Sequence, residues 1–441
     1  MNLGLGIGPT FIGPAFLWSP SRLRVGTRVV RDLTLRPNRM YSDVAGTTPI
    51  AGPGAEVAAI RDSRGVLVAT QTDFAAQPIF AREPAGGVRN RANGSAAVGI
   101  ATYWPASAVQ SGVTMTKIAS GIDAQGRAFV DLQYQGTPSA ASHNLAYAGF
   151  SHGMIPAGVG TVATSSFQFE RIAGTATGVT GCRATIVERS AVDAFLLFAA
   201  GSLSLGATET TVSFTKTAVE ATVAKLETSI QMLFVIGTPV DVTFRVTALQ
   251  FETGSTRTAW QRNLSAFDVT EAGQRDLYAL WRDGFDDFMP LETPFAPTGD
   301  FTMAAAFDHR AGADSLGIFG GPNTRFGQAS SNQPRIDANL SANRTQFTEQ
   351  SNGRGVLVVR SVGSGAAQGW RNGVALTPTL TGLMRPLAAP GFTDLFRSTA
   401  TISSAGRFYG GLLLDEGDTP LTEAERLLMQ NYLAYNGGIT L

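Results

Sequence analysis

The stretch DVTFRVTALQFETGSTRTAWQRN, residues 241–263, decides the fold of the middle of this 441-residue chain. Its first nine residues alternate apolar and polar side chains. The apolar positions are Val242, Phe244, Val246 and Ala248. Because successive side chains of a β-strand point to opposite faces of the sheet, a period of two predicts a half-buried strand. Residues 129–135, FVDLQYQ, alternate in the same way, and both segments are typical of an antiparallel sandwich.

Further strand-like segments flank these two, separated by Gly-rich turns at the spacing of an all-β protein. In the middle of the chain they are FQFERI from Phe167, CRATIVER from Cys182, TTVSFTK from Thr210 and IQMLFVI from Ile230. Nearer the C-terminus they are DFTMAAAF from Asp300, GVLVVRSV from Gly355, QGWRNGVALT from Gln368 and GRFYGGLLLDEG from Gly406. Asn372-Gly373 predicts a hairpin with a type I′ turn.

A single helix is expected at the C-terminal end, in TPLTEAERLLMQNYLAYNGG. Thr422 and Glu425 have the T-x-x-E spacing of a capping box, and Gly437 offers a C-terminal stop. The helical spacing predicts that one face packs on the sandwich. The residues expected on that face are Leu428, Tyr432 and Tyr435.

Residues 1–101 show neither the hydrophobic period of a strand nor that of a helix, because Pro and Gly interrupt every short apolar run. Such a segment becomes ordered only by docking on something else. We therefore predict a mostly β protein with an irregular N-terminal arm (1–101) and two antiparallel β-sandwich (jelly-roll) domains (102–263 and 264–441), the last ending in an α-helix.

Composition and charge argue against several classes of protein. The formal net charge is zero and charged residues are 15% of the chain, so no global field attracts nucleic acid or anionic lipid. The lone Cys182 excludes an intrachain disulfide and indicates a buried thiol. No run of about 18 apolar residues is present for a membrane helix, and the apolar N-terminus lacks the pattern of a signal peptide.

Two segments resemble adhesion proteins of tailed bacteriophages and gene transfer agents. SDVAGTTPIAGPGAEVAAIRDSRGVLVATQTDFAAQP, from Ser42, is similar to their "dSAGTTPVt…D.SG…ATQ…RP" phrase, and DGFDDFM, from Asp283, to "FDGvDDfl". In many such proteins the two phrases are nearly contiguous. Here about 200 residues separate them, which indicates that a further module is inserted.

The resemblance also implies what the modules are. The phrase LQFETGSTRT, from Leu249, resembles the ending of carbohydrate-binding-module-like jelly rolls, and the C-terminal part resembles a concanavalin A-like (laminin G-like) domain. Together these imply a virion protein, a head spike or tail fibre, that binds host surface polysaccharide such as capsule or lipopolysaccharide. Its partners would be capsid or tail proteins, host glycan and further copies of itself, without nucleic acid and without membrane insertion.

An arginine cluster suits an anchor on such a particle. Between Ser21 and Met40 the sequence has six arginines against one aspartate. The alternatives are a solvated basic loop or a contact to nucleic acid, although no aromatic residues are interleaved for stacking. The residues assigned to particle anchoring are Arg22, Arg24, Arg28 and Arg31.

The residues argue against catalysis. Retaining glycoside hydrolysis needs two carboxyl groups roughly 5 Å apart, and no E-x-D-x-E run places them on one strand. Asp283, Asp286 and Asp287 are interpreted as a turn, with a Ca²⁺ site as the alternative. The three histidines are not spaced as metal ligands. We expect no cofactor and no enzyme; a depolymerase on the same scaffold, or a structural spike that binds protein, are the alternatives.

Sugar binding on a β-sandwich uses aromatic rings that stack on pyranose faces and polar side chains that bond hydroxyl groups. The candidates are Trp104, Tyr134, His143, Asn144, Trp260, Phe326, Trp370 and Asn372.

Overall fold

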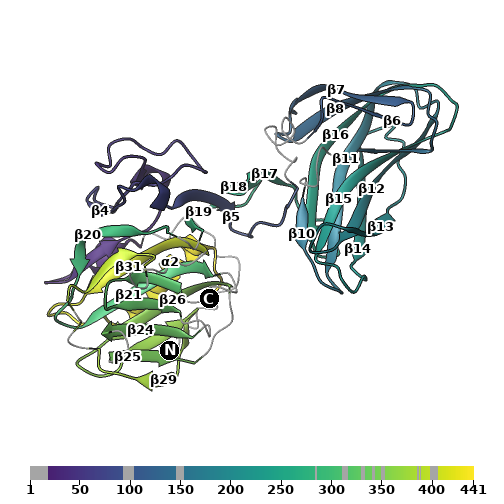
Figure 1. Cartoon of the computed structure of the whole chain (residues 1–441). Coiled ribbons are helices and arrows are strands. Elements are labelled where there is room, and N and C mark those ends of the chain that lie inside the picture. Colours follow the sequence, from purple (N-terminus) through teal and green to yellow (C-terminus); the bar gives the residue numbers. More distant parts are fainter. Residues whose placement is uncertain are drawn as a thin grey trace, which may run out of the picture. The chain divides into compact units, whose positions relative to one another are not determined.

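The computed structural model describes residues 18–92, 104–145, 153–283, 286–309, 316–328, 333–339, 343–348, 353–384, 387, 389–397 and 406–441. It is mostly β (Figure 1), and the strand pairs whose register is described are antiparallel, except that β18 pairs with β5 in parallel. The chain forms two compact units. Unit 1 combines residues 1–81 with 277–441, and unit 2 is residues 82–276. Unit 2 is thus inserted into unit 1, as inferred from the separation of the two phrases.

Unit 1 is a sandwich of two sheets. One contains β1 (Val29–Asp32), β31 (Gly406–Asp415), β21 (Phe301–His309), β26 (Gly353–Ser361), β27 (Gln368–Arg371), β28 (Val374–Ala375) and the end of β19 (Asp276–Arg282). The other has the order β2 (Met40–Tyr41), β3 (Ala59–Arg61), β4 (Leu67–Thr70), β20 (Met289–Phe295), β30 (Phe392–Leu395), β22 (Leu316–Gly320), β23 (Arg325–Gln328), β24 (Pro334–Asn339), β25 (Asn343–Phe347) and β29 (Pro378–Thr381). Apolar side chains from both sheets form one core. At Gly411 on β31, an added Cβ would lie 2.7 Å from the Phe319 ring on β22.

The N-terminal segment is part of this sandwich, which corrects the expectation of a separate arm over residues 1–101. β1 pairs with β31 from Val29↔Asp415 to Asp32↔Leu412. Leu33, Met40 and Ile60 are fully buried in the core of unit 1. The segment has no core of its own, as the sequence indicated, but it docks on the distant C-terminal half of the same chain. Local periodicity does not reveal such a pairing.

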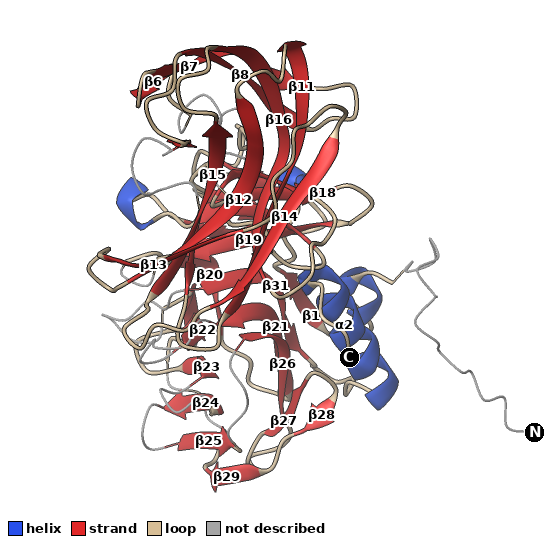
Figure 2. Ribbon diagram, turned by 90° about the vertical axis from the view of Figure 1, so that its right-hand side faces the viewer, coloured by secondary structure: helices blue, strands red, loops and turns tan. Residues whose placement is uncertain are grey.

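The C-terminal helix α2 (Glu423–Gly437) packs on β21, β26 and β31 (Figure 2). The capping box is confirmed: the Thr422 hydroxyl accepts a hydrogen bond from the Glu425 amide, and the Glu425 carboxylate accepts one from the Thr422 amide. The left-handed residue that ends the helix is Gly438, not Gly437. The packed face also differs from the prediction, because Met429 and Leu433 are buried whereas Leu428 and Tyr435 are exposed.

Unit 2 is a second sandwich (Figure 1). Its five-stranded sheet contains β10 (Met154–Pro156), β15 (Lys225–Phe234), β12 (Val179–Arg189), β13 (Phe195–Ala200) and β9 (Ser142–Leu145). Its six-stranded sheet has the order β14 (Thr210–Thr217), β11 (Val162–Gly174), β16 (Val240–Thr253), β8 (Ala128–Gly136), β7 (Val113–Ile122) and β6 (Ser107–Gln110). The unit ends in a hairpin of β17 (Gln261–Ser265) and β18 (Asp268–Glu271). The chain enters through β5 (Ile79–Pro84) and leaves through β19.

The alternating segments lie where the sequence predicted. β8 and β16 are antiparallel neighbours, with Val130 opposite Val246 and Leu132 opposite Phe244. These four side chains are buried in the core of unit 2, together with Cys182. Burial raises the pKa of the Cys182 thiol well above its ordinary value.

The boundaries differ from those expected at 101/102 and 263/264. Asn90 already belongs to unit 2, where its side-chain amide donates to the carbonyls of Leu249 and Gln261. Among the described residues, no helix has the length and apolarity that crossing a membrane requires.

Candidate functional site

Three of the predicted sugar-binding aromatics lie in the cores. Trp104 is 2% exposed and Tyr134 is fully buried in unit 2, while Phe326 is fully buried in unit 1. A ring enclosed on both faces offers no surface for stacking on a pyranose. These three assignments are therefore corrected to core residues. For Tyr134 the alternation with Val130 and Leu132 already favoured the core.

Three other candidates have structural contacts. Trp260 is partly buried and packs against the core of unit 2. The Trp370 ring in unit 1 is covered by the buried Arg426 guanidinium, 4.4 Å from its centroid. Asn372 holds the predicted hairpin: it and Gly373 have positive φ of 48° and 88°, and its side-chain oxygen accepts a 2.8 Å hydrogen bond from the Val356 amide. These contacts explain the three residues without a ligand.

The last two candidates, His143 and Asn144, lie on β9, and their side chains are outside the described part of the structure. The backbone register places Asn144 opposite Gln231 and His143 opposite Met232 on β15. Because Met232 belongs to the core, its neighbour Gln231 on β15 lies on the outer face of the five-stranded sheet.

That outer face carries two exposed aromatic rings. Phe195 is 62% exposed and Phe198 is 37% exposed, both on β13. In a regular strand, residues three apart point to opposite faces. Here a β-bulge changes the register: Phe195 is opposite Arg189, whereas Phe198 is opposite Val187. The extra residue, Leu196, packs against the core, so both rings lie on the outer face.

Polar side chains continue this face across the neighbouring strands. The Arg183 Nε donates a 2.8 Å hydrogen bond to Oε1 of Gln231. Arg189 forms an ion pair with Glu227, and its Nη1 also donates to the carbonyl of Asp193. The two guanidinium groups are thus held at fixed positions on β12 by partners on β15 and in the turn before β13.

We call these residues the aromatic–polar face of unit 2. It consists of Arg183, Arg189, Phe195, Phe198, Glu227 and Gln231. Rings on one sheet face with guanidinium, amide and carboxylate groups offer the group types that sugar recognition uses: an apolar plane for the pyranose face, and donors and acceptors for the hydroxyls. The sequence contained a partial signal, since FLLF at residues 195–198 is an apolar run that begins two residues after Asp193. The bulge that brings both rings to one face cannot be predicted from the local sequence pattern.

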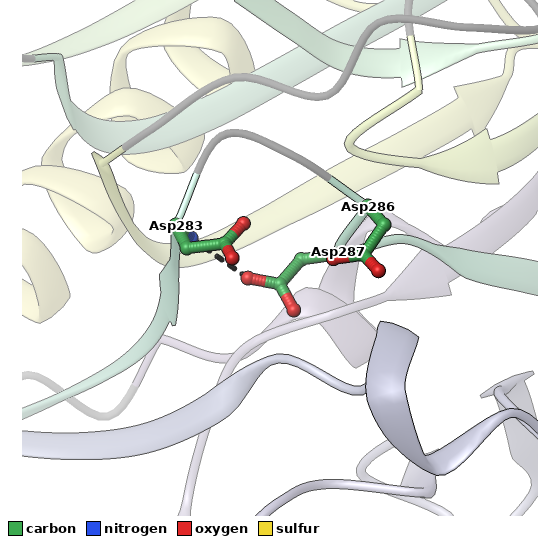
Figure 3. Close-up of side chains that lie close together, drawn as sticks. All are labelled: Asp283, Asp286 and Asp287. Carbon is green, nitrogen blue, oxygen red and sulfur yellow. Dashed lines mark hydrogen bonds between the residues drawn. The ribbon is translucent and has the colours of Figure 1, made fainter.

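An acidic turn in unit 1 is the second chemically distinctive cluster (Figure 3). Carboxylate oxygens of Asp283, Asp286 and Asp287 lie within 4.8 Å of one another, and the Asp283 amide donates a 2.7 Å hydrogen bond to Oδ2 of Asp287. Burial, together with the charges of Asp283 and Asp286, raises the pKa of Asp287 to about 7. The neighbouring Arg282 guanidinium is buried over the Phe396 ring, and desolvation lowers its pKa to about 9.

Three carboxylate groups gathered in one turn offer the oxygen ligands that Ca²⁺ takes, and paired carboxyl groups are also what glycoside hydrolysis uses. A carboxyl group that holds its proton near neutral pH is suited to donate it as a general acid. The hydrogen bond from Asp283 to Asp287 also fits the turn that was predicted from the sequence.

Three of the four arginines assigned to particle anchoring contact their own chain. Arg28 is buried and forms an ion pair with Glu425 at 2.7 Å. Arg31 donates to the carbonyls of Thr293 and Pro294, and Arg24 to that of Val30. Of the four, only Arg22 is exposed. The basic cluster thus joins the N-terminal segment to the sandwich.

Comparison with known proteins finds no matching family model and no matching curated protein. Three solved structures are similar in part. One described as "CBM4 structure and function" is 15% identical, covers 40% of this chain and 88% of its own, and has a TM-score of 0.17. An arabinofuranosidase complexed with arabinofuranosyl-alpha-1,2-xylobiose is 12% identical over 64% of this chain and 63% of its own, with a TM-score of 0.28.

The third is the N-terminal CBM22 tandem domain of a Paenibacillus barcinonensis protein. It is 11% identical, covers 72% of this chain and 89% of its own, and has a TM-score of 0.22. All three TM-scores lie below 0.5, and these likenesses therefore identify neither a family nor a function for this chain.

Proposed function

We propose that this protein is a non-enzymatic adhesin that binds surface polysaccharide through the aromatic–polar face of unit 2. The observation that carries the proposal is the pair of exposed rings, Phe195 and Phe198, on the same sheet face as the fixed guanidinium groups of Arg183 and Arg189. A single exposed ring such as Phe74 needs no ligand to explain it, whereas exposed apolar side chains that gather on one face mark a binding site more often. A sugar ring suits this surface because it has one apolar face and a rim of hydroxyl groups.

The natural setting of such an adhesin is a phage-like particle that displays many copies. Each sugar contact is weak, and linked sites convert later contacts into intramolecular ones. The resemblance of the phrases at Ser42 and Asp283 to phage and gene transfer agent adhesins supports this setting. The test is immunogold labelling of intact particles, in which absence of the protein from the particle surface would contradict the proposal.

The binding test uses affinity electrophoresis of the full chain in gels that contain capsular polysaccharide or lipopolysaccharide of the host. We expect Phe198→Ala and Phe195→Ala each to weaken retardation by about 1 kcal/mol, the value of one lost aromatic contact. The matched control is Phe74→Ala, which removes an exposed ring from unit 1. Equal retardation of all three variants and the parent would refute the assignment of the face.

A hydrolase is the second candidate, because the acidic turn combines carboxyl groups within 4.8 Å with an Asp287 pKa of about 7. In that case Asp287 would donate a proton to the leaving oxygen and a neighbouring aspartate would act as the nucleophile. Incubation with host polysaccharide and measurement of new reducing ends distinguishes the two functions. We expect no release; release that Asp287→Asn abolishes would establish the hydrolase.

A further inference from the structure

The C-terminal helix carries a second apolar stripe, on the side opposite to the residues that pack on the sheets. After its first turn α2 exposes four residues, and none of them is charged: Leu427, Leu428, Asn431 and Tyr435. We call these residues the outer stripe of α2. The solvent side of a surface helix normally carries charged and polar side chains. An outer stripe without charge therefore indicates a surface that another segment or molecule covers.

One aromatic ring already covers a neighbour of this stripe. Trp18, the first described residue, is 7% exposed, and its ring centroid lies 5.1 Å from that of Tyr432. Leu428 lies four residues before Tyr432 and Tyr435 three residues after it, so the three side chains are neighbours on the helix surface. The chain thus meets α2 at Tyr432, between the exposed side chains of Leu428 and Tyr435.

The residues that precede Trp18 match the outer stripe in composition. Residues 1–17, MNLGLGIGPTFIGPAFL, contain no charged side chain, and Phe16 and Leu17 come directly before Trp18. These residues lie outside the described part of the structure. When fully extended, 17 residues span about 56 Å, whereas α2, with its 15 residues, is about 22 Å long. The segment is therefore long enough to follow the whole stripe from Trp18.

We propose that residues 1–17 bind along the outer stripe of α2 and cover Leu428 and Tyr435. The contact of Trp18 with Tyr432 fixes where this interaction begins. Residues two apart in an extended chain are about 6.6 Å apart, close to the helix pitch of about 5.4 Å, so Phe16 can reach a position one turn away from Tyr432. Removal of apolar side chains from water on both surfaces stabilises the contact.

Attachment through Trp18 favours this segment over a separate molecule. Because residues 1–17 are tethered beside the stripe, their effective concentration is on the order of millimolar, which a free partner rarely reaches. The interaction joins the two ends of the sequence within unit 1. It also explains the helical spacing of Leu428, Tyr432 and Tyr435, which predicted a packed face although the sheets contact Met429 and Leu433 instead.

The experiment measures how fast a maleimide labels a cysteine placed on the outer stripe. Asn431→Cys introduces a thiol between Leu428 and Tyr435 without removing an apolar side chain, and the native Cys182 is fully buried. We expect labelling of the full chain to be about tenfold slower than labelling of the same variant without residues 1–17. The matched control is Val374→Cys, because Val374 is 67% exposed on β28 of the same unit. Its labelling rate should not depend on residues 1–17.

A point substitution makes the same comparison in the full chain. Phe16→Asp should accelerate labelling of Asn431→Cys about tenfold, because an unpaired carboxylate is costly to bury against apolar side chains. Asn2→Asp adds the same charge far from Trp18, beyond the length that α2 requires, and should leave the rate unchanged. Circular dichroism confirms folding of each variant, and Phe16→Asp carries the test if the chain without residues 1–17 does not fold.

Two results would overturn the proposal. Equal labelling rates of Asn431→Cys with and without residues 1–17 would show that the segment does not cover the stripe. Protection that increases with protein concentration would assign the stripe to a second copy of the chain. Slow labelling that is independent of concentration, and that Phe16→Asp abolishes while Asn2→Asp does not, is the result we expect.

Discussion

Replacement of Arg28 by Met tests whether the N-terminal segment is a structural part of unit 1. The Arg28 side chain is 1% exposed, and its guanidinium donates to the carbonyls of Thr419 and Pro420 and to both oxygens of Glu425. Met keeps most of the apolar stem but leaves these acceptors without their donor. Breaking a buried ion pair by removing one partner costs about 3–5 kcal/mol.

Because the Glu425 carboxylate is partly exposed, we expect Arg28→Met to lower the free energy of unfolding by about 3 kcal/mol, the lower end of that range. The pH dependence gives an independent check. The hydrogen bond from Arg28 is the main cause that lowers the pKa of Glu425 from 4.5 to about 2. At 1.36 kcal/mol per pKa unit, this shift corresponds to a pH-dependent contribution of Glu425 to stability of at most about 3.4 kcal/mol. Solvent screening of the partly exposed carboxylate reduces that contribution to about 1–2 kcal/mol.

Because the pKa of Glu425 is lowered in the folded state, its contribution is fully present above pH 4.5 and is lost as the pH falls toward 2. The difference in stability between the parent and Arg28→Met should therefore be largest at pH 7 and shrink below pH 4. Urea unfolding followed by tryptophan fluorescence measures it, with Arg22→Met as the exposed control, expected within about 0.5 kcal/mol of the parent. Equal stability of Arg28→Met and the control at pH 7 would refute the structural role.

Three further predictions concern single sites. Thr422→Ala removes the helix cap and should lower the thermal stability of unit 1 by about 1 kcal/mol without changing retardation in glycan gels; weakened binding at unchanged stability would reverse that assignment. Cys182 is fully buried with a raised thiol pKa, so a thiol reagent should label it only in denaturant, and rapid labelling of the native protein would contradict its place in the core. The raised pKa of Asp287 makes the folded state bind the proton more tightly than the unfolded chain, so stability should fall as the pH rises from about 4 through 7. Asp287→Asn should flatten that dependence in pH-resolved calorimetry, and an unchanged slope would assign it to another group.

The sequence by itself determined the local elements of this protein. A period of two located β8 and β16, Asn372-Gly373 located a tight hairpin, and T-x-x-E located the start of α2. The separation of the phrases at Ser42 and Asp283 indicated an inserted module, and unit 2 is that insertion. These features depend on residues that are neighbours in the chain or on the order of segments, and sequence patterns record both.

Tertiary structure alone decided where segments meet and which side chains reach the surface. β1 pairs with β31, which lies almost at the other end of the sequence. Arg28, one of the basic residues that suggested a particle anchor, therefore forms an ion pair within the chain. The bulge at Leu196 brings Phe195 and Phe198 to one face, while Trp104 and Phe326 are buried in the cores of the two units. Side-chain exposure is set by long-range pairing and packing, and for that reason the scaffold was predictable from the sequence whereas the candidate site was not.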